Sequence, residues 1–101
     1  MGFLSKLFGS APDFKKLVNQ GAIIVDVRTR EEYKTGHIRG SINIPLQVLG
    51  SNFSKIRSDK PVITCCASGM RSARAKSMLK SNGFEQVYNG GGWNKLQSLI
   101  R

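Results

Sequence analysis

Three stretches of the sequence predict strands of a β-sheet, and the first two are apolar runs of the kind found in buried strands. They span residues 22–27 (AIIVDV), 60–65 (KPVITC) and 85–89 (EQVYN). In the first two, apolar β-branched residues follow one another without regular alternation with polar ones, which is typical of strands covered on both faces. A shorter run, residues 41–45 (SINIP), predicts a brief fourth strand that stops at Pro45.

The segments between these runs carry apolar residues at helical spacing. They predict helices over residues 12–20, 46–56, 72–82 and 93–100, and a short helical turn over 29–36. Pro12 suits a first helical turn, and Gly21 and Gly83 mark helix ends. The three glycines at 90–92 predict a tight turn before the last helix.

Strands that alternate with helices predict an α/β fold with a parallel sheet and right-handed crossovers. The length of 101 residues fits one domain. We place this domain at residues 11–101, after a short segment, residues 1–10. That segment has two pairs of apolar residues four positions apart, so we expect a short amphipathic helix docked on the domain's own core. The pairs are Phe3 with Leu7 and Leu4 with Phe8.

Sixteen lysines and arginines against six acidic residues give the chain a formal net charge of +10, which attracts anionic partners. The basic residues are scattered and the aromatic residues do not interleave with them, which argues against nucleic-acid binding.

No apolar run approaches the roughly 20 residues of a membrane span. The two cysteines are neighbours and form no disulfide framework, which indicates a reducing compartment. We therefore expect a cytoplasmic protein, and a monomer.

The candidate chemistry lies where the second buried strand ends, at Cys65 and Cys66. Small residues and then a predicted helix follow, so successive backbone N–H groups converge there. In parallel sheets, ligands bind beyond the carboxyl ends of the strands, and this loop lies at such an end. A thiol held by those amides and close to Arg71 loses its proton more easily than a free thiol does.

Two interpretations of the cysteine pair remain open at this point. Counted from Cys65, five residues separate it from Arg71, the spacing by which phosphatases cup a phosphate. Counted from Cys66, the pattern is C-x-x-G-x-R-S, with Gly69 at the turn, and this favours Cys66 because the turn needs a residue without a Cβ. Strand alternation also puts Cys65 on the other face of the sheet, where it is expected to be a small buried hydrophobe, with a resolving thiol as the alternative.

Three motifs in order resemble those of the single-domain rhodaneses, a family of sulfurtransferases. They are IIVDVRTREEYKTGHIRGSINIPL, VITCCASGMRSARA and VYNGGGWNKL, and together they cover most of the chain. The resemblance implies a parallel five-stranded sheet flanked by helices on both faces. It also implies that residues 66–71 form a loop sized for sulfur, because the related phosphatases and arsenate reductases use a loop one residue longer.

The implied reaction is transfer of sulfane sulfur from an anionic donor such as thiosulfate to a thiol or cyanide, through a persulfide on Cys66. Arg71 would grip the sulfonate of the donor or brace the loop. The backbone of the loop would hold the terminal sulfur; its residues are Ala67, Ser68, Gly69, Met70, Arg71 and Ser72. A module that carries persulfide between proteins, with an acidic acceptor protein, is an alternative, as is a phosphatase or arsenate reductase of the same fold.

Other polar residues near the motifs are given supporting roles. Asp26 and Arg28 are expected to form an ion pair or hydrogen bond near the loop. Ser72 is expected to cap the helix that follows. His37 is expected to be architectural and Trp93 to belong to the core. Arg74 and Lys76 either extend the field of positive charge or are solvated, and the sequence indicates no metal and no cofactor.

Overall fold

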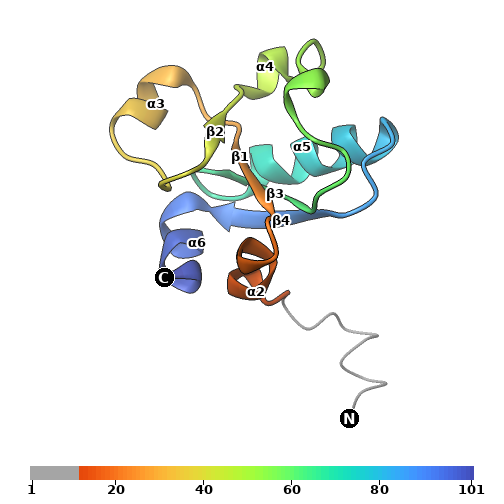
Figure 1. Cartoon of the computed structure of the whole chain (residues 1–101). Coiled ribbons are helices and arrows are strands. Elements are labelled where there is room, and N and C mark those ends of the chain that lie inside the picture. The colour runs from red at the N-terminus through yellow and green to blue at the C-terminus, as the bar shows by residue number, and fades with distance from the viewer. Residues whose placement is uncertain (1–11) are drawn as a thin grey trace.

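Four parallel strands form the sheet of the domain, in the order β2-β1-β3-β4. The structure, a computed structural model, describes residues 12–101 (Figure 1). The strands are β1 Ile23–Asp26, β2 Ile42–Asn43, β3 Val62–Cys66 and β4 Val87–Gly92. The helices are α2 Phe14–Asn19, α3 Arg30–Lys34, α4 Leu46–Leu49, α5 Met70–Ser81 and α6 Trp93–Ile100, with a 3₁₀ turn, η1, at Phe53–Lys55. The predicted α/β class and parallel sheet are confirmed, whereas the helix expected within residues 1–10 lies outside the described residues.

The expected count of five strands is wrong for the part of the chain that the structure describes, which has four. The described residues begin at Pro12, and α2 starts two residues later with Asp13 as its N-cap. The Asp13 carboxylate accepts a hydrogen bond from the Lys16 backbone N–H at 3.0 Å, which fixes the helix start. This part of the chain therefore has no room for a strand ahead of α2.

Helices pack on both faces of the sheet, as the resemblance implied (Figure 1). Because side chains alternate along β3, Val62 and Cys66 face one core cluster while Ile63 and Cys65 face the other. The first cluster includes residues of α4 and α5, and the second includes residues of α2 and α6. All five residues of β3 are buried, so the central strand carries its apolar run through the middle of the domain.

The helix predicted over residues 46–56 is wrong, because it is interrupted. α4 ends at Leu49, and only the single turn η1 follows it. Gly50 has low helix propensity. In addition, the Asn52 side-chain amide donates a hydrogen bond to the Val48 carbonyl at 2.6 Å. In a continuing helix, that carbonyl would accept from the backbone N–H of Asn52 instead. The apolar spacing was informative nevertheless, since Leu49 and Ile56 are both buried in the core.

The tight turn predicted at residues 90–92 is also wrong, because β4 runs through Gly92. Thr64 pairs with Asn89 and Cys66 pairs with Gly92, so β4 contains one more residue than β3 over this stretch. This extra residue is a β-bulge. A Cβ at position 92 would lie 2.9 Å from the Ala67 carbonyl oxygen, so the glycine lets β4 pass close to the loop that follows Cys66.

Candidate active site

The loop after Cys66 joins the central strand to α5. The helix begins at Met70, two residues earlier than predicted, with Gly69 as its N-cap at a φ of 107°. A side chain at that φ would be strained, which supports the choice of Cys66 as the start of the motif. The loop turns tightly enough that the backbone amides of Gly69 and Ser72 both point back at the end of β3.

Cys66 Sγ accepts hydrogen bonds from the backbone N–H groups of Gly69 at 3.0 Å and Ser72 at 3.4 Å. The residue is 1% exposed. Burial opposes ionisation of the thiol, but hydrogen bonds outweigh it and hold the pKa of Cys66 below its ordinary value. The groups that favour the thiolate are the Ser72 hydroxyl and the backbone amides of Ser72, Gly69 and Ser68. This environment therefore favours the thiolate form of Cys66.

Cys65 has the opposite environment. It is fully buried on the other face of β3, in the cluster that contains Ile63 and Leu96. Burial raises the pKa of its thiol, and the neighbouring Asp26 raises it further. Cys65 is accordingly a buried apolar residue, as the alternation of the strand predicted.

Ser72 does not cap α5, contrary to the expectation, because it lies inside the helix. Its fully buried side chain points toward the sulfur, with Oγ 3.4 Å from Cys66 Sγ. The hydroxyl donates to Asn89 Oδ1 at 2.6 Å. The sequence analysis missed Asn89, which lies on β4. The strand is of mixed polarity, and nothing in its sequence shows that the Asn89 side-chain amide is directed at the loop.

Arg71 forms a two-point ion pair with Glu32 of α3. Its Nη1 and Nη2 donate to Glu32 Oε1 and Oε2 at 2.7 and 2.9 Å. The side chains are 36% and 37% exposed, so the pair lies at the surface beside the loop. Glu32 was also missed, although it has a sequence signal: with Thr29 it forms a capping box at the start of α3.

Asp26 and Arg28 form a buried ion pair at the end of β1. Arg28 Nη2 lies 2.7 Å from Asp26 Oδ2, and both side chains are nearly inaccessible to solvent. The guanidinium also donates to the Glu32 and Gly36 carbonyl oxygens and stacks 4.7 Å from the centre of the Trp93 ring. Arg28 therefore ties β1, α3 and α6 together next to the site.

The side chains of the other predicted residues lie around this centre and form no hydrogen bond to the sulfur. Ala67, Ser68 and Met70 are exposed at the loop, and Met70 is 82% exposed. His37 is exposed and stacks on Tyr33 at 3.7 Å, which fits an architectural role. Trp93 packs on the core, Arg74 is exposed and Lys76 is partly exposed. Among residues 12–101 no group of three potential metal ligands is present.

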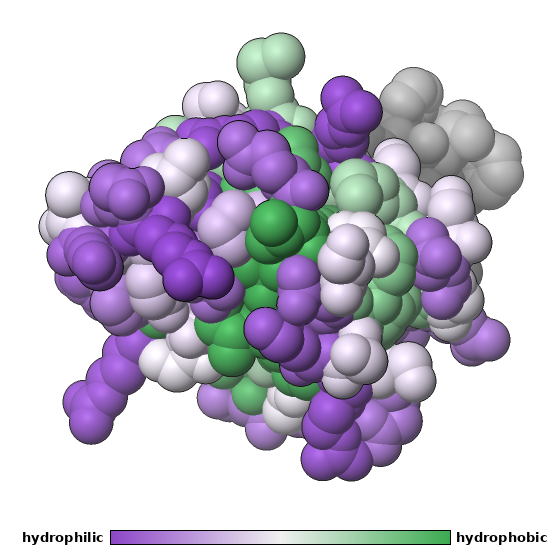
Figure 2. All heavy atoms as spheres, turned by 90° about the horizontal axis from the view of Figure 1, so that it is seen from above, coloured by the Kyte–Doolittle hydropathy of each residue, from purple (hydrophilic) through white to green (hydrophobic). Residues whose placement is uncertain are grey.

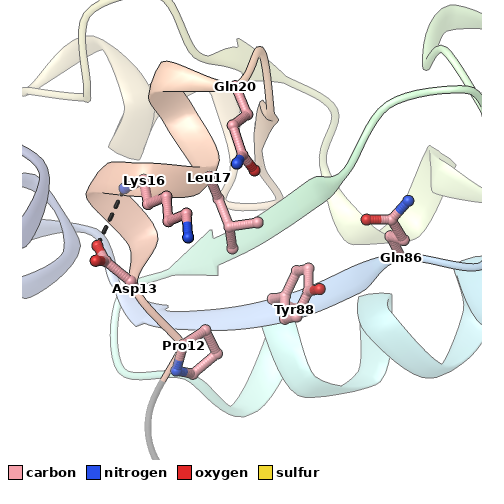
Figure 3. A pocket seen from close by; sticks show the side chains of 7 residues that line it. All are labelled: Pro12, Asp13, Lys16, Leu17, Gln20, Gln86 and Tyr88. Carbon is pink, nitrogen blue, oxygen red and sulfur yellow. Dashed lines mark hydrogen bonds between the residues drawn. The ribbon is translucent and has the colours of Figure 1, made fainter.

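A hollow between α2 and β4 lies apart from this chemistry (Figure 3). Figure 3 shows Leu17 and Tyr88 approaching each other across it, with Lys16 and Gln20 at its side. None of its lining residues belongs to the loop after Cys66, and none is a cysteine; they are Pro12, Asp13, Lys16, Leu17, Gln20, Gln86 and Tyr88. The Cys66 loop is therefore the candidate active site.

The sheet, the loop and the cradled cysteine define a parallel α/β domain with a cysteine loop at the end of its central strand, and comparison with known proteins identifies its family. The Rhodanese-like domain family matches residues 10–99, so the chain belongs to the rhodanese-like domains. It is 37% identical over 70 residues to thiosulfate sulfurtransferase PspE of Escherichia coli, covering 67% of each chain. A solved structure, a rhodanese with anions from E. coli, superposes with a TM-score of 0.70 at 31% identity, over 74% of this chain and 91% of that one.

A further relative leaves the particular activity undefined. The uncharacterized protein YqhL of Bacillus subtilis is 44% identical over 81 residues, which are 79% of this chain. The chain spans 64% of the length of YqhL. In the described part of the chain, no helix has both the length and the apolar character to cross a membrane.

The ion pair between Glu32 and Arg71 predicts a pH-dependent contribution to stability. Arg71, together with the Thr29 amide, lowers the pKa of Glu32 to about 2. Because this pKa is below the value of about 4.3 expected in the unfolded chain, the contribution is present above pH 4.3 and is lost as the pH falls toward 2. Glu32→Gln, which keeps an oxygen for the Thr29 amide, should lower the free energy of unfolding at pH 6 by about 1 kcal/mol or less, since the pair is half-exposed.

Denaturant unfolding of the wild type and of Glu32→Gln between pH 6 and 2 measures this contribution. The difference between the two proteins should shrink across the lower half of that range. Glu31→Gln, on the same helix but outside any ion pair among the described residues, is the matched control and should show no such trend. A Glu32→Gln difference that stays constant with pH would contradict the assignment.

Proposed function

We propose that this domain is a sulfurtransferase that carries sulfane sulfur on Cys66. The observation that supports the proposal most strongly is the set of amide hydrogen bonds to Cys66 Sγ at the carboxyl end of the central strand. Membership of the rhodanese-like family, which includes relatives named thiosulfate sulfurtransferase, supports the same reaction class.

The first half-reaction loads the cysteine. The Cys66 thiolate attacks the outer sulfur of a donor such as thiosulfate, the sulfur–sulfur bond of the donor breaks, and sulfite leaves with the bonding electron pair. The product is a Cys66 persulfide. In this proposal, backbone amides of residues 67–72 stabilise its terminal sulfur, which bears the negative charge; the Gly69 and Ser72 amides that bond to Cys66 Sγ support this role. Since Glu32 already occupies the two Nη groups of Arg71, we assign Arg71 to bracing the loop.

The second half-reaction discharges the cysteine. A thiolate or cyanide attacks the terminal sulfur of the persulfide, and Cys66 Sγ leaves as the thiolate that began the cycle. No general base is needed while Cys66 is ionised. The phosphatase alternative depended on Cys65, and its thiol faces the opposite core cluster from the loop. The environment of Cys66 therefore favours sulfur transfer.

Incubation with thiosulfate should add the mass of one sulfur atom to Cys66, and addition of cyanide should remove it as thiocyanate. Fragmentation mass spectrometry locates the added atom. Cys66→Ser should abolish both loading and turnover because no other thiol faces the loop, whereas Cys65→Ala should retain them. Equal loss of activity in the two variants would refute the assignment of Cys66, and absence of loading in the wild type would refute thiosulfate as a donor.

Transfer to a protein thiol is a second candidate function, and exposed features of the site favour it. Met70 offers an apolar contact at the loop, and the net charge of +10 favours an acidic acceptor. Figure 2 shows the face seen from above, where apolar residues lie among polar ones. The exposed Met70 side chain suits a macromolecular acceptor better than it suits cyanide.

Acceptor peptides with one cysteine each test this second function. At low salt, the loaded protein should transfer sulfur about tenfold faster to a cysteine flanked by aspartates and glutamates than to one flanked by lysines. Added salt should reduce the difference, since it screens exposed charges. Stopped-flow rates corrected for the thiol pKa of each peptide give the comparison. Equal corrected rates at low salt would argue against an acidic acceptor.

A further inference from the structure

The hydroxyl hydrogen of Ser72 has a defined position in this structure. Ser72 Oγ and Asn89 Oδ1 lie only 2.6 Å apart, so a hydrogen must lie between them. The orientation of the Asn89 amide is fixed by two backbone partners: Gly91 N–H donates to Oδ1 at 2.9 Å, and Nδ2 donates to the Gly69 carbonyl at 3.2 Å. Because Oδ1 carries no hydrogen, the hydrogen comes from Ser72.

This orientation leaves the lone pairs of Ser72 Oγ to face Cys66. The distance between Sγ and Oγ is 3.4 Å, and the thiol is the donor to the serine oxygen. A chain of hydrogen bonds then runs from the sulfur through the serine to the asparagine, and it satisfies the thiol form of Cys66. The thiolate has the opposite requirement, because it needs a hydrogen from Ser72. Ser72 has one hydroxyl hydrogen for two acceptors.

We propose that Asn89 is a positioning residue that competes with Cys66 for the hydroxyl hydrogen of Ser72 and so sets the thiolate fraction of the nucleophile. When Cys66 loses its proton, the Ser72 O–H turns from Asn89 Oδ1 to Sγ, and Oδ1 keeps only its bond from Gly91. When Sγ becomes the uncharged inner sulfur of a persulfide, the O–H turns back. No covalent bond changes in either step. The inference rests on the proposed function only in taking Cys66 as the nucleophile.

The charges around Cys66 do not offer a simpler control of its ionisation, because they are paired. From α5, Arg71 interacts with the sulfur through its charge, and its guanidinium is bound to Glu32 of α3. From β1, the Asp26–Arg28 ion pair lies beside Cys65, next to the sulfur in the chain. A substitution at Asn89 leaves all of these groups in place. Any change in the pKa of Cys66 that it causes therefore comes from the Ser72 hydroxyl or from the loop.

Asn89 also holds the loop, through the Gly69 carbonyl, and this second role must be separated from the first. Losing that bond loosens the amides around Sγ and raises the pKa of Cys66, whereas freeing the Ser72 hydroxyl lowers it. The two effects differ in one respect: only the second requires Ser72. A double-mutant cycle between positions 72 and 89 isolates it, because the loop effect is common to both backgrounds and cancels.

The experiment compares the wild type, Asn89→Ala, Ser72→Ala and the double variant. The rate of alkylation of Cys66 by iodoacetamide, followed by mass spectrometry as a function of pH, gives the pKa of the thiol in each. Asn89→Ala changes the pKa of Cys66 in each background. That change should be about half a pKa unit more negative with Ser72 present than with Ser72→Ala, which is about threefold in the ionisation constant. Equal shifts in the two backgrounds, or a difference of the opposite sign, would overturn the proposal.

A second cycle keeps the test decisive if Asn89→Ala unfolds. Asn89→Asp retains an oxygen for both Ser72 and Gly91, and its carboxylate holds the hydroxyl more strongly. Asn89→Asp should raise the pKa of Cys66 more with Ser72 present than with Ser72→Ala. The coupling between positions 72 and 89 then has the opposite sign to that found with Asn89→Ala. Thermal unfolding of each variant verifies the fold. The alkylation needs no sulfur donor, so failure to load sulfur would refute the proposed function without affecting this result.

Discussion

The hydrogen bonds that converge on one buried sulfur govern the architecture of this end of the domain. Cys66 ends the central strand with almost no access to solvent, where a thiolate without partners would be costly. The amides of Gly69 and Ser72 compensate for that burial, and they reach Sγ because the loop turns at Gly69 and α5 starts at Met70. The same loop passes close to β4, where Gly92 leaves space for the Ala67 carbonyl.

Glu32 connects the loop to the rest of the molecule. Its carboxylate binds Arg71 beside the loop, and its backbone carbonyl accepts a hydrogen bond from Arg28, which is paired with buried Asp26. One residue of a short helix is thus in contact with both arginines of the site. The arginines leave little unpaired charge near the sulfur, so local hydrogen bonds determine the ionisation of Cys66.

The sequence predicted those parts of the fold and site that depend on local pattern. The apolar runs located β1 and β3, and their alternation separated Cys66 from Cys65 because side chains on a strand must alternate. The glycine at position 69 identified the correct frame because few residues tolerate its φ. The family resemblance added the order of the motifs, and the comparisons confirmed the family.

Two of the errors involve contacts between segments distant in the sequence. The predicted turn at 90–92 is a strand because Gly92 passes close to the loop after Cys66, and that approach is invisible in the spacing of residues. Ser72 was taken for a cap because a serine near a helix start usually is one, yet its partner is Asn89 on β4. The helix expected over 46–56 failed for a local reason, the Asn52 side chain, which competes for a helix carbonyl.

The central claim is that the loop amides keep Cys66 ionised more readily than an ordinary thiol, whose pKa is about 8.5. A pH titration of thiolate ultraviolet absorbance, taken as the difference between the wild type and Cys66→Ser, measures this directly because burial raises the pKa of Cys65 out of the working range. The account predicts a single transition with its midpoint below 8.5. A midpoint at or above 8.5 would contradict it.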